Sequence, residues 1–276
     1  MKKLALSICQ MKVGSNKEEN LKRAERFIRE AKSQGSELVI LPEIFNAPYQ
    51  TDLFPLYAEP FPGPSTEILS KTARNCGVCL IGGSIIERDE DGRLYNSSYV
   101  FNEEGDLVGR HRKVHLFDID LPGRIAFRES DTLSAGSSIT VFNFKSITIG
   151  LMICYDCRFP ELVRAAALKG AKLLVIPAAF NLTTGPAHWE LLMRCRAVDN
   201  QMFVAAASPA RNNEVSYQAW GHSMVVDPWG SIIKEAGSDE EIISAVLDFS
   251  ELERIRNELP LLKQRRTDIY ELKYFK

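Results

Sequence analysis

Short apolar runs separated by amphipathic segments make up most of this chain. Apolar runs predict buried β-strands over residues 4–9, 38–41, 78–86, 147–153, 173–176, 203–207, 224–226 and 242–247. Apolar residues at helical spacing predict helices over residues 15–35, 65–75, 161–168 and 188–198. The first of these helices is expected to open with a capping box, Ser15-x-x-Glu18, and to end at Gly35. Residues 95–101 and 107–116 predict a hairpin.

Two helix–strand units within this pattern resemble each other. Residues 35–46 and 170–181 share glycine, leucine, proline, phenylalanine and asparagine in register, and each segment follows a helix. Chance similarity of two common units is one explanation. The other, which we favour, is a pseudo-symmetric α/β fold: a four-layer α-β-β-α sandwich of two mixed sheets with helices outside. In the aligned slots Glu43 matches Ala178, so only one unit keeps a carboxylate just past its strand, where sites in α/β sheets tend to lie.

Composition and charge exclude several classes of function. Lys and Arg total 34 and Asp and Glu total 36, giving a net charge of -2 over 276 residues. This balance provides no general attraction to nucleic acid or to anionic membranes. No apolar run approaches the roughly 20 residues that span a bilayer, and the apolar stretch after Lys2-Lys3 is too short for a signal peptide. We therefore expect a cytoplasmic protein whose six cysteines are thiols.

The cysteines include two C-x-x-C pairs, Cys76/Cys79 and Cys154/Cys157. Cys154 is predicted at a strand-to-helix turn ahead of Pro160, where nearby backbone N–H groups favour a thiolate. A buried, inert thiol, a thiol redox centre and a zinc site that combines both pairs are the alternatives. The zinc site is disfavoured because Cys79 lies in an apolar strand, in which Cys76 and Cys79 would point to opposite faces.

Two further charged residues become informative only in combination with Cys154. Glu43 follows Pro42 at the end of an apolar strand, and Lys113 lies in a strand-like stretch of mixed polarity, residues 109–116. Each alone is typical of a solvated surface position. His115 and His188 are likewise more often structural histidines than bases.

Three separated motifs together resemble the nitrilase superfamily: Leu41-Pro42-Glu43, residues 112–117 (RKVHLF) and residues 150–161 (GLMICYDCRFPE). The resemblance extends from Leu4 to about Phe249. It implies a carbon–nitrogen hydrolase in which Cys154 is the nucleophile, Glu43 the proton carrier, and Lys113 with the Tyr155 N–H the oxyanion site. It also implies a second carboxylate, Glu129, beside Lys113; without the resemblance Glu129 reads as an exposed loop residue. Because position 157 varies in this family, the second C-x-x-C is expected to be accidental.

A closer resemblance is to the omega-amidase branch of that superfamily. It rests on residues 45–49, 115–120, 180–190, 197–201 and 207–211. It implies hydrolysis of α-ketoglutaramate and α-ketosuccinamate to the keto acid and ammonia, without a metal or cofactor. Another small-amide hydrolase of the superfamily, such as a deaminated-glutathione or carbamoyl amidase, a redox or zinc module, and a catalytically idle binding module remain alternatives. The substrate carboxylate needs a cationic or hydrogen-bonding partner, for which the candidates are Tyr49, Arg158, Thr183 and Arg196.

The expected organisation is one carbon–nitrogen hydrolase domain over residues 1–249 followed by an extension, residues 250–276. The extension begins as an amphipathic helix and ends in a mixed-charge segment with Tyr270, Tyr274 and Phe275. We expect it to pack on its own domain or on a neighbouring subunit. The resemblance implies at least a homodimer, with a small-molecule amide as the substrate.

Overall fold

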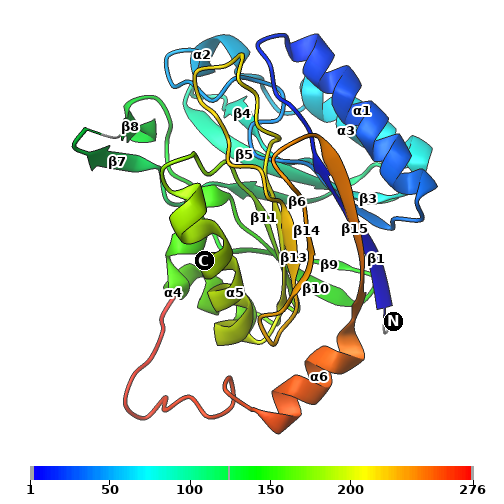
Figure 1. The fold of residues 1–276 in the computed structure, drawn as a ribbon, viewed down its shortest axis with the longest axis vertical. Helices are drawn as coiled ribbons and strands as arrows, with labels where there is room; N and C mark the ends of the chain where they lie inside the picture. The colour runs from blue at the N-terminus through cyan, green and yellow to red at the C-terminus, as the bar shows by residue number, and fades with distance from the viewer. Residues whose placement is uncertain (1–2, 124, 275–276) are drawn as a thin grey trace.

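The computed structural model describes residues 3–123 and 125–274, which form two large β-sheets covered by helices (Figure 1). The first sheet has seven strands in the order β15-β1-β2-β3-β5-β4, with β6 also paired to β5. Its strands are β1 (Lys3–Gln10), β2 (Leu38–Ile40), β3 (Cys79–Ile81), β4 (Ile85–Arg88), β5 (Leu94–Phe101), β6 (Leu107–Arg112) and β15 (Glu241–Asp248). Parallel pairs join β1, β2 and β3, and β15 runs antiparallel to β1, so the sheet is mixed.

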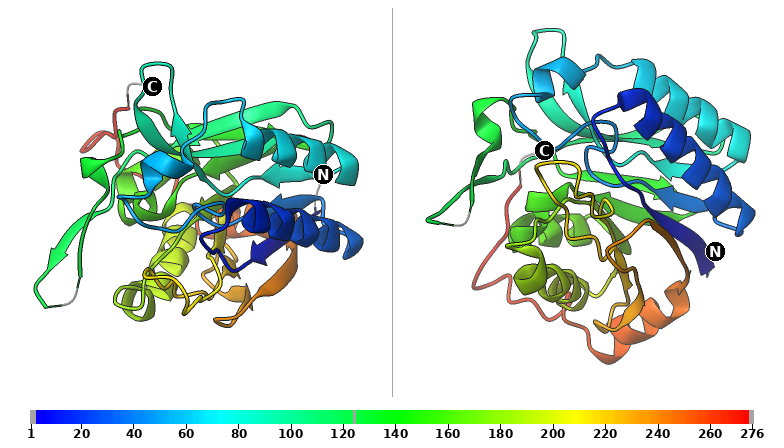
Figure 2. Two further views of the ribbon diagram at one scale, coloured as in Figure 1. Left: turned by 90° about the horizontal axis from the view of Figure 1, so that it is seen from above. Right: turned by 45° about the horizontal axis from the view of Figure 1, so that its top comes forward.

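The second sheet has six strands in the order β14-β13-β12-β11-β10-β9 and is also mixed. Its strands are β9 (Thr140–Phe144), β10 (Ile147–Leu151), β11 (Leu173–Pro177), β12 (Phe203–Ala207), β13 (Met224–Val226) and β14 (Ile232–Glu235). A separate two-stranded sheet of β7 (Asp118–Leu121) and β8 (Ile125–Arg128) forms a hairpin that projects from the body of the molecule (Figure 2).

The alternation of side chains between the two faces of each strand explains the layering. In β1 and β2, Leu6, Ile8 and Ile40 face a core shared with the second sheet, whereas Val39 packs with the buried side of a helix pair. That pair is α1 (Lys17–Ser33) and α3 (Pro64–Cys76), and α4 (Pro160–Leu168) with α5 (Gly185–Asn200) covers the other sheet (Figure 1). The predicted four-layer α-β-β-α sandwich is confirmed. The remaining helices are α2 (Phe54–Tyr57) and α6 (Phe249–Glu258).

The start of α1 and the strand predicted over residues 78–86 were wrong in detail. The N-cap of α1 is Asn16, whose Oδ1 accepts the Glu19 N–H, and not Ser15, because asparagine one position later caps equally well. The predicted strand 78–86 is two strands, β3 and β4, which are separated at Gly82-Gly83. Gly83 has φ +60°, and a Cβ there would lie 2.1 Å from the Pro42 carbonyl oxygen. The chain therefore turns beside the Pro42 segment, which bears on the site described below.

The second half of the predicted hairpin ends earlier than expected. β6 stops at Arg112, so Lys113 lies at the strand end, where its N–H still donates to the Asn96 carbonyl oxygen at 2.9 Å. The predicted position of Cys79 in a strand is confirmed, since it begins β3, whereas Cys76 ends α3, so the two thiols do not lie on one strand. Among the described residues, no helix is both long and apolar enough to cross a membrane.

The extension begins with α6 as predicted, and residues 259–274 follow without a regular helix. This segment lies against its own domain: Tyr270 lines a hollow together with Arg164 of α4, and the Lys169 ammonium lies 5.0 Å from the Tyr274 ring centroid. The alternative location on a neighbouring subunit stays a prediction, and Phe275 and Lys276 are outside the described residues.

Candidate active site

Glu43, Lys113 and Cys154 lie together although they come from distant parts of the chain. They follow β2, β6 and β10 respectively, and thus both large sheets contribute. Lys113 Nζ donates to Glu43 Oε1 at 3.0 Å. The exposed fractions are 1% for Glu43, 0% for Lys113 and 5% for Cys154, so this is a buried polar cluster in an apolar sandwich. Charged side chains buried to this extent are stable only when a neighbouring opposite charge compensates them.

The backbone beside Glu43 is held in an unusual conformation. Ile44 has φ 45°, which is strained for a β-branched residue. Its N–H donates to Ser84 Oγ at 2.9 Å, and the Ser84 N–H donates to the Pro42 carbonyl oxygen at 3.2 Å. The turn at Gly83 brings Ser84 to this position. The surrounding bonds therefore fix the direction in which the Glu43 side chain leaves the strand.

Cys154 also occupies a left-handed conformation, with φ 46°, at the start of the 3-10 turn η2 (Cys154–Arg158). The predicted position in a strand-to-helix turn is confirmed, since β10 precedes η2 and α4 follows at Pro160. The turn position predicts a tendency toward a thiolate, which the surroundings of the thiol oppose. Burial, and then the charge of Glu43, raise the pKa of the Cys154 thiol well above its usual value, although Lys113 and a backbone hydrogen bond with Ala179 lower it. Loss of its proton therefore requires a neighbouring base.

The two carboxylate oxygens of Glu43 have different environments. Oε1 accepts hydrogen bonds from Lys113 Nζ, Asn96 Nδ2 at 2.9 Å and the Tyr49 hydroxyl at 3.3 Å. Oε2 is buried and has no partner of its own among the described residues. Burial raises the pKa of Glu43, Lys113 lowers it, Glu129 raises it, and the nearby Cys154 thiol lowers it again; the net direction is upward. Glu43 is therefore a better proton acceptor than an ordinary glutamate, with one oxygen left for the thiol.

Glu129 is a second carboxylate at Lys113, and it is fully buried rather than an exposed loop residue. It starts the 3-10 turn η1 (Glu129–Asp131) after the β7–β8 hairpin. Its Oε1 accepts from Lys113 Nζ at 2.9 Å and from the Tyr49 hydroxyl at 2.6 Å, and its Oε2 accepts the Phe117 N–H at 2.7 Å. Burial alone would lower the pKa of Lys113, but Glu129 and Glu43 raise it well above its usual value. Lys113 is thus a fixed cation between two carboxylates.

Sequence reasoning did not identify Asn96 or Tyr217, which both contribute to this environment. Asn96 lies within β5, in a run of residues that are all buried. Tyr217 lies in a loop; its hydroxyl donates to the Ala179 carbonyl oxygen, and its ring stacks on Tyr49 with centroids 4.6 Å apart. Neither position has a spacing or motif that distinguishes it from ordinary strand or loop residues.

A small cavity lies beside Glu43 and Tyr49. A cavity of about 30 Å³ is bounded by Glu43, Tyr49, Ala179 and Tyr217, among other residues. This volume accommodates about one water molecule. Tyr155, which directly follows Cys154, is half-buried, and its ring meets Phe117 edge-on at 5.1 Å. The site is therefore compact and walled by aromatic rings.

The residues predicted to bind the substrate carboxylate differ in how far they are already engaged by contacts within the protein. Tyr49 is bound into the cluster through Glu129. The Arg158 guanidinium lies 4.6 Å from the Phe180 ring centroid and 3.2 Å from His188 Nδ1, and its Nε is buried without a partner among the described residues. Thr183 is half-buried in the turn before α5, where its N–H donates to the side chain of Asn181.

Arg196 has contacts unlike those expected of a substrate anchor. Its Nε donates to the Cys157 carbonyl oxygen at 2.7 Å, its Nη2 donates to the Arg158 carbonyl oxygen at 3.1 Å, and its Nη1 lies 3.6 Å from Asp199. All three nitrogens are thus engaged by the protein. In the structure this arginine supports the carbonyl groups at the end of η2, which leaves it less available to a substrate than Arg158.

The burial and the raised thiol pKa values of the C-x-x-C cysteines argue against a redox pair or a zinc site. Cys157 is fully buried, and burial raises the pKa of its thiol to about 12, which makes it a poor resolving thiol. Cys79 faces the core between the sheets, and burial raises the pKa of its thiol to about 12 as well. Within residues 3–123 and 125–274, no group of three or more His, Cys, Asp and Glu side chains is arranged to hold a metal ion.

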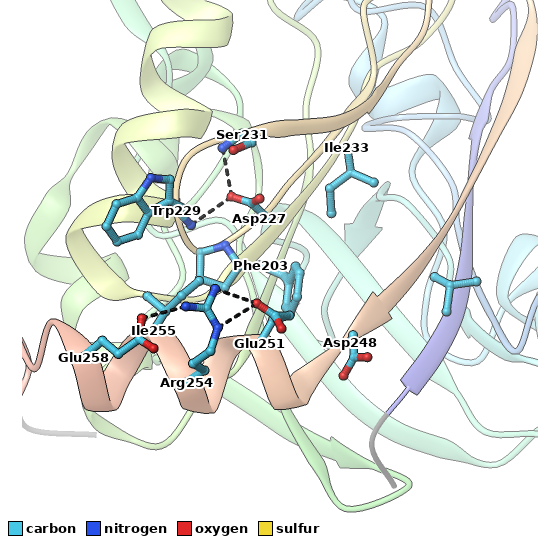
Figure 3. A pocket seen from close by; sticks show the side chains of 12 residues that line it. Phe203, Asp227, Trp229, Ser231, Ile233, Asp248, Glu251, Arg254, Ile255 and Glu258 are labelled. Carbon is cyan, nitrogen blue, oxygen red and sulfur yellow. Dashed lines mark hydrogen bonds and ion pairs between the residues drawn. The ribbon is translucent and has the colours of Figure 1, made fainter.

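A larger hollow lies elsewhere on the molecule. It measures about 540 Å³ and is formed by the β13–β14 turn, β15 and α6 (Figure 3). Trp229 is 62% exposed at its rim, and Arg254 pairs with Glu251 and Glu258. None of the predicted site residues is among its described lining residues, so this hollow is separate from the cluster of Glu43, Lys113 and Cys154.

Comparison with known proteins agrees with this assignment. A family model described as carbon-nitrogen hydrolase matches residues 5–257. Omega-amidase NIT2-A from Xenopus laevis is 54% identical over 270 residues, and omega-amidase NIT2 from Homo sapiens is 52% identical over 270 residues; each alignment covers 98% of both chains.

Solved structures show the same fold. Nit3 from Saccharomyces cerevisiae, described as a member of branch 10 of the nitrilase superfamily, matches with a TM-score of 0.89 and 45% identity, over 96% of this chain and 97% of its own. The C. elegans NitFhit protein matches with a TM-score of 0.91 and 32% identity, over 100% of this chain and 68% of its own. The chain therefore belongs to the carbon–nitrogen hydrolase family of the nitrilase superfamily.

Proposed function

We propose that this protein is an omega-amidase, which hydrolyses the terminal amide of small keto-dicarboxylate monoamides such as α-ketoglutaramate and α-ketosuccinamate. The observation that supports the chemistry best is the buried cluster in which Lys113 joins Glu43 and Glu129 next to the Cys154 thiol. The substrate class rests on relatives named omega-amidase that are 52–54% identical over nearly the whole chain.

The first half of the reaction forms a thioester. Glu43 takes the proton from Cys154 as the sulfur attacks the amide carbon, and the carbonyl electron pair moves onto oxygen. The ammonium of Lys113 and the N–H of Tyr155 stabilise that oxyanion. Glu43 then gives its proton to the nitrogen, the carbon–nitrogen bond breaks, and ammonia leaves.

The second half returns the enzyme to its starting state. Glu43 accepts a proton from water while the water oxygen attacks the thioester carbon. When the carbon–sulfur bond breaks, the thiolate regains a proton from Glu43 and the keto acid is released. The single free oxygen of Glu43, Oε2, suits this repeated transfer because its other oxygen stays bonded to Lys113 and Asn96.

The substrate also carries a carboxylate, for which we propose Arg158 as the partner. Arg158 follows Cys154 by one 3-10 turn, and its buried Nε has no partner among the described residues. Stacking on Phe180 holds the guanidinium plane. A charged donor aligned in this way favours a carboxylate over a neutral group.

The test compares matched alanine substitutions in the same turn. Cys154→Ala should abolish ammonia release from α-ketoglutaramate, whereas Cys157→Ala, which removes a buried thiol three residues away, should keep most of the wild-type kcat. Mass spectrometry of Cys154 after incubation with a substrate amide should show a single acyl adduct. Equal losses in both variants would contradict the assignment of the nucleophile. A panel of ω-amides of keto and amino dicarboxylates, read by ammonia release, identifies the substrate, and a preference for a different small amide would contradict the omega-amidase proposal.

A further inference from the structure

Asp156 is a buried carboxylate that the reaction described above does not use. It lies in η2, two residues after Cys154, and is 0% exposed. An ionised carboxylate at such a position needs several hydrogen bonds to offset the loss of water. The identity of its partners indicates what it holds together.

Its bonds reach two different parts of the fold. Oδ1 accepts the backbone N–H of His115 at 2.8 Å and His115 Nδ1 at 2.9 Å. Oδ2 accepts His111 Nε2 at 2.9 Å and the backbone N–H of Ile153 at 3.2 Å. His111 and His115 flank Lys113, whereas Ile153 directly precedes Cys154. One carboxylate therefore binds the segment that carries the cation and the turn that carries the nucleophile.

The strand pairing alone does not connect these two segments. β6 belongs to the seven-stranded sheet and β10 to the six-stranded sheet. The position of Lys113 relative to Cys154 thus depends on contacts made across the sandwich. Asp156 supplies such contacts directly beside both residues.

These hydrogen bonds also determine which ring nitrogens of His111 and His115 must carry a hydrogen. Burial alone would raise the pKa of Asp156. Hydrogen bonds with His111 and His115 lower it by more, so the pKa of Asp156 lies well below its usual range. Asp156 is then an acceptor only, so His111 must present an Nε2–H and His115 an Nδ1–H. On its other side His111 Nδ1 meets Thr140 Oγ1 at 2.9 Å, and the His115 ring stacks on Phe159 with centroids 3.6 Å apart.

We propose that Asp156 is a positioning residue for catalysis: through His111 and His115 it sets the distance between the Lys113 ammonium and the Cys154 sulfur. The inference rests on the proposed function, because it assigns a purpose to the separation of these two groups. Asp156 touches no reacting atom. Its loss should impair the chemical step and leave substrate binding nearly intact.

The experiment measures kcat and KM for Asp156→Asn on the best substrate of the amide panel, well below the melting temperature. We expect kcat to fall about a hundredfold, since a displacement near 1 Å has that effect, with KM within threefold of wild type. Glu59→Gln is the matched control. Glu59 is 4% exposed, bonds Lys17 and Ser65 rather than Glu43, Lys113 or Cys154, and should lose stability without losing kcat.

A second variant covers the case in which Asp156→Asn does not fold. His115→Ala removes one side-chain donor to Asp156 from a residue whose side chain is 28% exposed, and it keeps the backbone bond. We expect kcat to fall about tenfold at nearly constant KM. Three results would overturn the proposal: a fall in kcat of less than threefold in the folded variants, a loss confined to KM, or an equal loss in Glu59→Gln. Failure of the proposed function is distinguishable, since wild-type protein would then release no ammonia from any ω-amide of the panel.

Discussion

Replacing Lys113 by methionine should lower both the stability and the activity of the protein, and a second substitution should separate the two effects. The side chain is fully buried and makes three contacts, with Glu43, Glu129 and the Tyr49 hydroxyl, at 3.0, 2.9 and 3.3 Å. Methionine keeps the volume but leaves two carboxylates without their shared cation. Removing one partner of a buried ion pair costs about 3–5 kcal/mol. For a chain of 276 residues, a loss of about 4 kcal/mol lowers Tm by about 7 °C.

Activity should respond differently from stability. Lys113→Met removes a donor to the oxyanion, for which a loss of about a hundred- to a thousandfold in kcat is typical. Adding Glu129→Gln to this variant removes one of the two unpaired carboxylates, while the amide still accepts the Phe117 N–H. The double variant should therefore recover about half of the lost stability, since neutral replacement of a buried ion pair is often tolerated. It should recover no activity.

The assays are thermal or urea unfolding of wild type, both single variants and the double variant, and ammonia release from α-ketoglutaramate for the same four proteins. Glu129→Gln alone is the control that completes the cycle. If the double variant is no more stable than Lys113→Met, unpaired carboxylates are not the source of the instability. If Lys113→Met keeps more than about a tenth of the wild-type kcat, the proposed oxyanion role is refuted.

Two further predictions concern substrate binding and pH. Arg158→Met should raise KM for α-ketoglutaramate by about 10- to 100-fold, the usual effect of losing a hydrogen bond to a charged group, with little change in kcat. The control is Arg194→Met, which removes an exposed ion pair with Glu190. An unchanged KM in Arg158→Met would exclude Arg158 as the partner of the substrate carboxylate. Because burial raises the pKa of Glu43, the acidic limb of the kcat/KM profile should lie above the ordinary glutamate value of about 4.3. Glu129→Gln should move that limb to lower pH, because the charge of Glu129 also raises the pKa of Glu43; an unmoved limb in the measured profile would contradict this.

Local pattern was sufficient to predict most strands and helices and the position of Cys154. Strands such as β2 and β11 are short apolar runs that follow a helix, and the turn at Cys154 is marked by Pro160 at the start of α4. The details that failed depend on single positions. The left-handed φ at Gly83 divides one predicted strand into two, and competition between neighbouring capping residues moves the start of α1 by one residue.

The site needed information that local pattern does not contain. Lys113 and Glu129 have the sequence surroundings of surface residues, and in the fold they are buried together with Glu43 and Tyr49, which are distant along the chain. Only the resemblance to a family brought them together with Cys154 before the structure did. Asn96 and Tyr217 had no signal at all, because their contacts are made by side chains distant along the chain.

The charge balance of the cluster explains how such a buried site can carry out hydrolysis. Lys113 lies between two carboxylates, so with a neutral thiol the cluster of Glu43, Glu129, Lys113 and Cys154 has one net negative charge. Transfer of the thiol proton to Glu43 moves this charge to sulfur and then to the oxyanion, and the later proton transfers return it. The net charge of the cleft therefore stays constant while ammonia leaves as a neutral molecule, which avoids the cost of creating an uncompensated charge out of contact with water. A substrate carboxylate would disturb that balance, and for this reason it requires a cation outside the cluster, the role proposed for Arg158.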